Sequence, residues 1–521
     1  MSRRRCSHAL SLFVLLTTVW GVSLPSPAAS TPPNILFIFT DDHSYKTLSC
    51  YPEALPGVKT PAMDELAAHG VRFSHAYMGA WCMPSRATML TGRHPHGIES
   101  MRMSGKYPGS TYDPQQTPFF PAVFRQHGYH TAHIGKWHTG TDSGYGRDWD
   151  YQIVWNRPKY PENAGNYYTD QILETNGVKA DAPNPDYSTD NYTRWAADYI
   201  RGKHREAGKP WYLWLCYGGV HGPTTPADRH KGLHKNDPVT IPADILPPRE
   251  GKPEYLNQTQ AWKKAKDGRI VPLKSGETFG DNAKKARPYE DHIHQLNDCV
   301  QSLDEGVAEV MKALKESGQL ENTLVVLTAD QGFATGEHGL RTKLAPYDAA
   351  YRSPLIISMP GTLPEGKACT KPVNGTDLVA TFCAFSGIRL PWEVHGRDLT
   401  PLLKDPEGAA WPYPCFFEAT GDHFGHDVTK VVTEDPQNAA HHHVPWYAAL
   451  NDGHYKYVRY LTPGETEELY DLQADPEELT NLADAPAHRA TLEKLRATAV
   501  AELQRTRAGY ADHLPATKQM K

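Results

Sequence analysis

The 521-residue chain has little that would place it in a membrane or on nucleic acid. After its first thirty residues it contains no apolar run of the roughly 20 residues needed to cross a bilayer. It has no long basic run, and its net charge of -6 disfavours general nucleic-acid binding. Internal repeats and low-complexity tracts are absent from the sequence too. We therefore expect no stable membrane insertion and no nucleic-acid partner, and an anionic ligand would need a local positive site.

Cysteine is also scarce, with 8 residues in the whole chain. Cys6 lies in the N-terminal leader, and Cys82 lies in a motif described below. The other six could pair after export or stay free, and their spacing leaves both outcomes open.

The first thirty residues predict a secretory signal. Arg3, Arg4 and Arg5 precede an apolar stretch over residues 9–24, and small residues follow at 27–30. This order is typical of a cleaved signal peptide, and an uncleaved membrane anchor is the alternative. We expect residues 1–29 to be a signal peptide and the protein to be exported, either to the periplasm or as a secreted protein.

The pattern of apolar runs predicts the fold class. Short apolar runs bounded by polar residues, glycine or proline alternate with helix-length segments, as expected for strands buried on both faces of a parallel sheet. We predict an α/β fold with a large, mostly parallel sheet sandwiched by helices. The predicted strands cover residues 34–40, 131–135, 211–217, 324–328 and 354–359, and the predicted helices cover 60–69, 190–204 and 289–317.

Two later segments break this alternation. Residues 222–290 are rich in proline, lysine and glycine and predict an excursion over the active face. After about residue 410, aromatic alternating stretches and a final charged helix predict a smaller C-terminal α+β subdomain containing an antiparallel sheet. We therefore expect a catalytic domain over residues 30–410 and a subdomain over 411–521.

Chemically reactive residues follow the predicted strands. In open α/β sheets, ligands bind beyond the carboxyl ends of the strands, so residues at these positions are candidate site residues. The candidates are Asp41, Asp42, Lys136, His138, His221, Asp330 and Gln331. The three aspartates and the glutamine offer only oxygen ligands, which suit Ca²⁺ or Mg²⁺, with Ca²⁺ preferred for a dense protein cage. A zinc site would need several histidines or cysteines at the same place.

Cys82 stands at the start of a predicted short helix. Pro84 favours a first helical turn and Gly92 a helix end. Arg86 is four residues after Cys82, so both lie on one face of the helix, where the free N–H groups of the first turn favour an anion. A buried cysteine at an ordinary helix start is the simpler interpretation of this segment alone.

The wider motif set resembles a known family. Cys82-Met83-Pro84-Ser85-Arg86, followed by Thr91-Gly92-Arg93, resembles the signature of the formylglycine-dependent type I sulfatases of the alkaline phosphatase superfamily. The resemblance implies an alkaline-phosphatase-like fold and the hydrolysis of sulfate esters. It continues through Asp41-Asp42, Gly135-Lys136-Trp137-His138, His221-Gly222-Pro223, Asp330-Gln331-Gly332, Gly336-Glu337-His338-Gly339, Lys343 and Leu469-Tyr470-Asp471-Leu472.

The resemblance also implies a role for each site residue. Cys82 would be oxidised to formylglycine by a formylglycine-generating enzyme, and the hydrated aldehyde would supply a hydroxyl nucleophile beside one Ca²⁺ ion. Arg86 would stabilise the hydrated group, and Lys136 and Lys343 would hold sulfate oxygens. His138 would assist proton removal, and His221 would protonate the leaving oxygen. The implied metal ligands are Asp41, Asp42, Cys82, Asp330 and Gln331, although many relatives have asparagine or histidine in place of Gln331.

The expected substrate is a sulfated glycan, most simply a polysaccharide fragment. The run His441-His442-His443 is interpreted as a solvated loop or as part of a substrate subsite that leans over the site from the C-terminal subdomain. A metal site made of histidines here is the third interpretation. A phosphonate or phosphate diester hydrolase with the same nucleophile is the alternative within the superfamily. An inactive glycan-binding protein is the alternative if Cys82 stays unmodified.

Overall fold

The computed structural model describes residues 32–102, 111–273 and 287–516. The predicted signal peptide, residues 1–29, lies outside the described residues. Within the described ranges, no helix combines the length and the apolar character needed to span a membrane.

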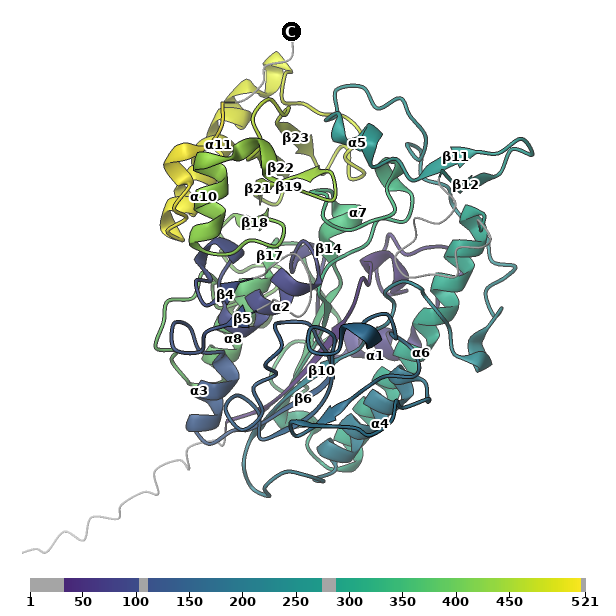
Figure 1. Cartoon of the computed structure of the whole chain (residues 1–521), viewed down its shortest axis with the longest axis vertical. Helices are drawn as coiled ribbons and strands as arrows, with labels where there is room; N and C mark the ends of the chain where they lie inside the picture. Colours follow the sequence, from purple (N-terminus) through teal and green to yellow (C-terminus); the bar gives the residue numbers. More distant parts are fainter. Residues whose placement is uncertain (1–31, 103–110, 274–286, 517–521) are drawn as a thin grey trace, which may run out of the picture.

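A ten-stranded sheet forms the centre of the molecule (Figure 1). Five neighbouring strands at its middle are parallel, so their carboxyl ends share one edge. In spatial order these five are β13 (Thr323–Ala329), β1 (Asn34–Thr40), β10 (Trp211–Cys216), β6 (His130–Trp137) and β7 (Tyr151–Asn156). The shorter strands on either side are β15 (Leu355–Ser358), β2 (Val71–Phe73), β16 (Lys367–Cys369), β8 (Glu174–Thr175) and β9 (Val178–Lys179).

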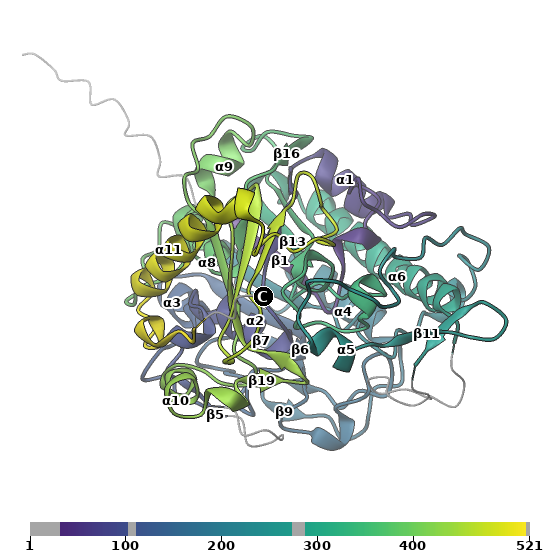
Figure 2. The ribbon, with the colours of Figure 1, turned by 90° about the horizontal axis from the view of Figure 1, so that it is seen from above.

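Helices cover both faces of this sheet, as Figure 2 shows from above. Along β1, Phe37 and Phe39 face one hydrophobic layer while Leu36 and Ile38 face the other, because successive strand residues point to opposite faces. The first layer holds α2 (Cys82–Thr91), α3 (Phe120–Gln126) and α8 (Gly375–Ser386). The second holds α1 (Pro61–Ala68), α4 (Ser188–Ile200) and α6 (Tyr289–Glu316). The predicted mostly parallel sheet sandwiched by helices is confirmed.

The fifth predicted strand departs from the expected direction. β15 runs antiparallel to β13, with Val325 opposite Ser358. The longest helix in the chain between them is the four-residue α7 (Asp348–Tyr351), so no long helix crosses a sheet face and the chain returns in the opposite direction. β7 was not predicted, because Gln152 and Asn156 interrupt its apolar pattern although all its residues are buried.

A second, four-stranded antiparallel sheet lies in the C-terminal part, as predicted. Tyr447 and Tyr460 pack from this sheet onto Tyr347 and Tyr351 of the main body. Its strands are β18 (Cys415–Ala419), β21 (Tyr447–Asn451), β22 (Tyr455–Tyr460) and β23 (Glu468–Asp471). Its other face is covered by α10 (His426–Glu434) and α11 (Arg489–Arg505).

The remaining elements are short. Trp262 of β11 donates a hydrogen bond from Nε1 to the carbonyl of Leu340 at 3.0 Å, so the excursion packs on the loop that leads to Lys343. The excursion holds α5 (Tyr255–Gln258), β11 (Trp262–Lys264) and β12 (Ile270–Pro272). Elsewhere lie β3 (Ala76–Tyr77), β14 (Arg352–Ser353), β17 (Val373–Asn374), β4 (Met101–Arg102), β5 (Thr111–Tyr112) and α9 (Thr400–Lys404). All seven cysteines of the described ranges are free thiols.

A stack of buried imidazoles lies where the chain after α2 and the chain after α8 meet the C-terminal sheet. His96 stacks on His395 with ring centroids 5.2 Å apart, and its Nδ1 lies 2.9 Å from the Glu418 carboxylate of β18. His94 lies 5.7 Å from His96 and packs edge-on against Phe416. Burial lowers the pKa of His94 to about 3. Burial opposes the ionisation of Glu418, but the nearby His96 lowers its pKa to about 2.

This junction predicts acid sensitivity. Below the ordinary histidine pKa of about 6.5, the unfolded chain binds a proton at His94 that the folded chain excludes until about pH 3, so stability falls as the pH drops through that window. Replacing His94 with phenylalanine keeps the ring and removes the titration. Urea unfolding at pH 7 and pH 5 should show a loss of unfolding free energy smaller by about 2 kcal/mol for His94→Phe than for the natural chain. Equal losses in both proteins would contradict this explanation.

Candidate active site

The acidic residues meet at the carboxyl edge of the parallel strands. Asp41 and Asp42 follow β1, and Asp330 and Gln331 follow β13, its direct neighbour in the sheet. The backbone N–H of Asp42 donates to Asp330 Oδ1 at 3.1 Å, so the two strand ends are tied together. All four side chains are buried. The strand order therefore brings three carboxylates and one amide from distant sequence positions to one place.

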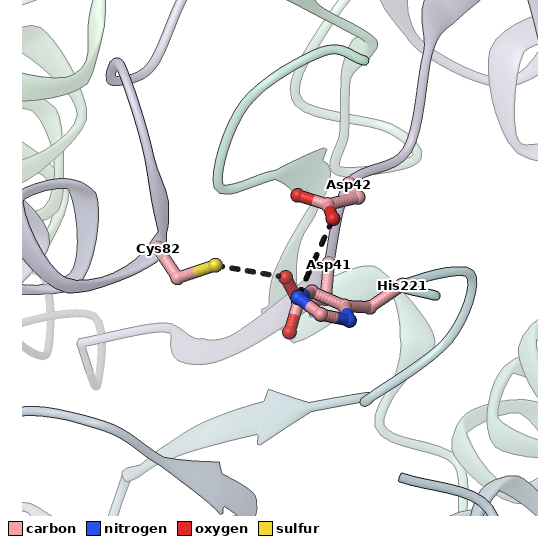
Figure 3. A group of neighbouring side chains, drawn as sticks. All are labelled: Asp41, Asp42, Cys82 and His221. Carbon is pink, nitrogen blue, oxygen red and sulfur yellow. Dashed lines mark hydrogen bonds and ion pairs between the residues drawn. The ribbon is translucent and has the colours of Figure 1, made fainter. Parts of the chain in front are cut away.

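Cys82 opens α2, a helix in which every residue is buried. Its Sγ lies 3.2 Å from Asp41 Oδ1, as Figure 3 shows, and 3.0 Å from Lys343 Nζ. Burial, followed by the Asp41 carboxylate, raises the pKa of the Cys82 thiol to about 12. The thiol is therefore protonated at neutral pH, which makes an unmodified Cys82 a poor nucleophile.

Three cations balance this acidic group. Lys136, at the end of β6, forms an ion pair with Asp41, and Lys343 Nζ lies 2.7 Å from Asp42 Oδ1. Arg86 projects from α2 with one nitrogen 3.2 Å from Asp330 Oδ2, and it also donates to the backbone carbonyl of Lys136 at 3.0 Å. The three cations come from three different elements, and each one is buried.

The pKa values of the acids reflect these neighbours. For Asp41, burial opposes ionisation, but Lys136 and the other cations hold its pKa well below the usual range. For Asp42, burial raises the pKa above the usual range. For Asp330, burial and the Asp41 charge raise the pKa to about 7. A metal ion bound among these groups would lower the pKa values of Asp42 and Asp330 and favour their ionised forms.

The donor set fits a hard divalent cation. Asp41, Asp42, Cys82 and His221 place one candidate ligand atom each within 4.8 Å of one another. Beside them, the buried Oε1 of Gln331 has no hydrogen-bond partner among the described residues. The carboxylate and amide oxygens among these atoms are ligands that Ca²⁺ and Mg²⁺ prefer, whereas the Cys82 sulfur and the His221 nitrogen are softer donors. Asp330 already makes hydrogen bonds within the protein, because its Oδ1 accepts from the backbone N–H groups of Asp42 and Gln331.

The two predicted catalytic histidines flank the acids. His221 follows β10, and its Nε2 lies 3.5 Å from Asp42 Oδ2 (Figure 3). His138 follows β6, and both of its ring nitrogens lie within 3.3 Å of Arg157 Nη1. Burial lowers the pKa of both imidazoles, reinforced by Lys343 at His221 and by Arg157 at His138. Both rings are therefore neutral at pH 7 in this arrangement.

Two residues beside these histidines were missed by sequence reasoning. Tyr167 stacks on His221, and the guanidinium of Arg157 lies 4.8 Å from the centroid of the Tyr167 ring. Both residues belong to the chain between β7 and β8, which carries no motif and follows a strand that was not predicted. The one sequence feature that could have indicated Tyr167 and Arg157 is their position after the buried strand β7, which neighbours β6.

The predicted substrate histidines lie on a two-residue hairpin, β19 (Ala440–His441) and β20 (Val444–Pro445). His441 stacks on Trp81, the residue before Cys82, with centroids 5.1 Å apart. His442 and His443 form the exposed turn with φ values of 48° and 66°, a conformation in which asparagine and glycine are more usual. The hairpin therefore adjoins the start of α2, with His441 half-buried against it.

Residues 33–388 match the family model named Sulfatase, which covers more than half of the chain. The chain belongs to the sulfatase family. The sulfatase is accordingly a sulfuric ester hydrolase, and its family generally uses a formylglycine and a metal ion. Residues 336–506 match a second model, described as N-sulphoglucosamine sulphohydrolase, C-terminal. The resemblance to type I sulfatases is confirmed.

Individual relatives cover nearly the whole sulfatase. It is 27% identical to an N-acetylglucosamine-6-O-sulfatase of Bacteroides thetaiotaomicron, over 95% of this chain and 90% of that protein. It is also 27% identical to the N-acetylglucosamine-6-sulfatase of Homo sapiens, over 92% of this chain and 85% of that protein.

A solved structure described as a complex with its substrate D-glucosamine-2-N,6-O-disulfate superposes on the sulfatase with a TM-score of 0.77. It is 24% identical and covers 92% of this chain and 99% of that one. A phosphonate monoester hydrolase from Silicibacter pomeroyi superposes with a TM-score of 0.67 at 22% identity, covering 91% of this chain and 96% of that one. These two likenesses show the fold alone.

Proposed function

We propose that this sulfatase hydrolyses sulfate esters of a sulfated carbohydrate, using a formylglycine formed from Cys82 and one Ca²⁺ ion. The observation that carries the proposal is the meeting of Cys82 with three buried carboxylates and two lysines at one sheet edge. Relatives named for sulfated glucosamine support the carbohydrate class. The Ca²⁺ ligands would be Asp41, Asp42, Asp330, Gln331 and residue 82, and the ion would balance the carboxylates and polarise the sulfate group.

Four residues of the chain would have separate roles around the nucleophile. Formylglycine at position 82 would supply, as its hydrate, a hydroxyl nucleophile. Lys136 and Lys343 carry the fixed positive charges that a sulfate group needs, and they would hold its oxygens as charge shifts in the transition state. Arg86, held by Asp330, would stabilise the hydrated side chain at position 82. His138 would accept the proton that leaves the hydrate when sulfate is expelled.

His221 would protonate the leaving oxygen. Its Nδ1 lies 2.6 Å from the carbonyl of Gly222, which can only accept a hydrogen bond, so Nδ1 carries a proton. Nε2 is the nitrogen directed to the acids, and it would have to take up a second proton before the ring can act as the acid. A sugar alkoxide is a poor leaving group and needs a proton, whereas 4-nitrophenolate leaves readily without one.

His221→Ala should therefore act selectively. General acid catalysis contributes about 10²–10⁴-fold, and its benefit shrinks as the leaving group becomes more acidic. We expect His221→Ala to lower kcat/KM by about 10²-fold or more on a sugar sulfate while sparing much more of the activity on 4-nitrophenyl sulfate. An equal loss on both substrates would assign His221 a role in sulfate positioning, and Lys343 would become the first candidate for the acid.

A direct comparison of substrates tests the proposed reaction. Purified protein whose Cys82 peptide shows the mass of the aldehyde should hydrolyse 4-nitrophenyl sulfate faster than bis(4-nitrophenyl) phosphate or a phosphonate monoester. The reverse order would favour the phosphonate or phosphate diester hydrolase. A protein with unmodified Cys82 and no turnover that still retains sulfated glycans would be the inactive binding protein.

The hairpin of His441, His442 and His443 is proposed as a substrate subsite. Its supporting contact is the stack of His441 on Trp81, next to Cys82. We propose that residues 30–410 form the catalytic domain and that residues 411–521 form a C-terminal subdomain, which contains this hairpin. His442→Ala should raise KM for a sulfated sugar by about 10-fold, the loss of about one charge-assisted hydrogen bond, with KM for 4-nitrophenyl sulfate unchanged. Unchanged KM for both would return the hairpin to the solvated-loop interpretation.

The proposal includes export and maturation. Residues 1–29 would direct the chain to the periplasm or out of the cell, and a formylglycine-generating enzyme would act on Cys82. N-terminal sequencing of the mature protein from the culture medium or periplasm tests the first point. A mature protein that begins at residue 1 would contradict it.

A further inference from the structure

Arg157 lies beside the reacting groups, directly after β7. In the sheet, Trp137 pairs with Asn156, so the next residues of the two strands, His138 and Arg157, stand side by side. The backbone N–H of Arg157 donates to the Trp137 carbonyl at 3.4 Å. Neighbouring strands are about 4.8 Å apart, so Arg157 lies one strand spacing from the chain that supplies Lys136 and His138.

The guanidinium of Arg157 is held in place by its neighbours. Its Nε donates to the Ala164 carbonyl at 2.8 Å, and its Cζ lies 4.8 Å from the centroid of the Tyr167 ring and 5.4 Å from that of Trp155. Its Nη1 lies within 3.3 Å of both ring nitrogens of His138, so the group packs against this imidazole. A guanidinium that is already held by packing loses less conformational freedom when an anion binds to it.

Arg157 also differs in exposure from the other three cations of the site. Arg86, Lys136 and Lys343 are 1%, 0% and 6% exposed, and each contacts one of the buried carboxylates. Arg157 is half-buried, so part of it reaches the surface while its guanidinium touches His138. It therefore lies at the margin of the site, where a substituent of the substrate other than the scissile sulfate can meet it.

The chemistry of arginine suits a separate anion. Its planar fork of N–H groups matches two oxygens of one sulfate or carboxylate group, and it stacks on aromatic rings, whereas lysine supplies a point charge. The scissile sulfate already has two lysines proposed for it, Lys136 and Lys343. The simpler interpretation is that Arg157 only packs its loop onto Tyr167 and Trp155. In that case its loss would affect every substrate alike.

We propose that Arg157 determines substrate specificity by binding a second anionic substituent, a sulfate or carboxylate group, on the sugar whose sulfate ester is hydrolysed. The proposal rests on the proposed function and narrows its substrate class to multiply charged sugars. The scissile sulfate would lie on the lysines, and the second anion would lie one strand spacing away, an offset that two substituents of one sugar can span.

The experiment measures competitive inhibition of 4-nitrophenyl sulfate hydrolysis, in protein with its aldehyde confirmed by mass. The inhibitors are methyl glucoside 6-sulfate and its 2,6-, 3,6- and 4,6-disulfates. Methyl glucuronoside 3-sulfate, compared with methyl glucoside 3-sulfate, tests a carboxylate as the second anion. We expect at least one doubly charged sugar to have a Ki about 10-fold or more below that of its singly charged reference, the gain from charge-assisted hydrogen bonds.

Arg157→Met should remove this preference. Methionine keeps a long side chain against Tyr167 and Trp155 but has neither the charge nor the donors. We expect the Ki of the preferred doubly charged sugar to rise by about 10- to 100-fold, and that of its singly charged reference to change by less than about 3-fold. Arg157→Lys keeps the charge without the fork and should have an intermediate effect. Arg157→Lys carries the test if Arg157→Met does not fold.

Lys179→Met is the matched control. Lys179 is exposed on β9, two strands from β7 in the sheet, and its ammonium group lies 4.7 Å from the centroid of the Tyr160 ring. This variant removes the same charge and a similar contact with an aromatic ring, away from His138. Every Ki should stay unchanged, and a shift as large as that of Arg157→Met would mean that the preference comes from the overall charge, which contradicts the proposal.

The other outcomes separate this proposal from the one on which it rests. If the natural chain hydrolyses 4-nitrophenyl sulfate but prefers no doubly charged sugar, the role of Arg157 is wrong and the proposed function stands. The role is equally wrong if Arg157→Met raises the Ki of singly and doubly charged sugars by the same factor, because Arg157 would then act on the scissile sulfate or through His138. If aldehyde-bearing protein does not hydrolyse 4-nitrophenyl sulfate, the proposed function fails, and the role of Arg157 fails with it.

Discussion

Replacing Cys82 with alanine is expected to abolish turnover on every sulfate ester, by about 10⁵-fold or to the detection limit, as removal of a catalytic nucleophile does. Unlike His221→Ala, this change should not discriminate between good and poor leaving groups, because attack on sulfur precedes departure of either. Rates on 4-nitrophenyl sulfate and on a sugar sulfate measure it. The side chain is small and buried, so the fold should survive.

A second cysteine provides the control for this variant. Cys383 of α8 is a free, half-buried thiol in the helical layer against the sheet, and nothing ties it to the acidic group. Cys383→Ala should keep full activity. Substantial turnover by Cys82→Ala, with Cys383→Ala unchanged, would show that another group attacks sulfur.

Removal of the metal is expected to have the next largest effect. Asp41, Asp42 and Asp330 are buried together, and burial raises the pKa values of Asp42 and Asp330, so a bound metal ion would favour the ionised form of both. Chelator-stripped protein should lose at least about 10³-fold in kcat/KM, because a metal ion contributes several kcal/mol to the transition state. Addition of Ca²⁺ should restore kcat/KM more fully than addition of Mg²⁺. Full turnover by rigorously stripped protein would exclude a metal-dependent reaction.

Asp330→Ala should reproduce that loss while leaving most of the fold intact. Asp304→Ala is the matched control, because Asp304 is also a buried acid but accepts the backbone N–H groups of Ala62 and Met63 at the start of α1. Asp304→Ala should reduce the free energy of unfolding by about 1 kcal/mol and leave kcat unchanged. Thermal unfolding and metal titration of both variants separate loss of the ion from loss of the fold.

Much of the site could be predicted because its residues follow apolar strands. Asp41 and Asp330 each come directly after a strand buried on both faces, and in a parallel sheet those ends lie at one edge. The direction of β15 could not be predicted, because an apolar run has the same appearance in either orientation. β7 was missed for a different reason: the side chain of its buried Asn156 donates to the Thr141 carbonyl and to Glu174, partners that only the folded chain supplies.

The surroundings of the site were harder to predict than its centre. Tyr167 lies in an irregular segment, and its stack on His221 depends on a tertiary fold that brings together positions 54 residues apart. The contact of His441 with Trp81 joins positions still farther apart in the sequence. Composition and periodicity carry no information about such pairs, whereas a strand end followed by an acid is a local pattern.

The burial of α2 has a consequence for how the enzyme matures. Every residue of this helix is covered, and Cys82 is 1% exposed, so a second protein cannot reach its sulfur once the chain has folded. If the thiol is converted to an aldehyde, the conversion has to occur on the nascent or unfolded chain. A molecule that folds first would stay inactive for its whole lifetime. The active fraction of any preparation would then depend on the relative rates of folding and oxidation. Slowing the folding of the chain in a producing cell should raise this active fraction.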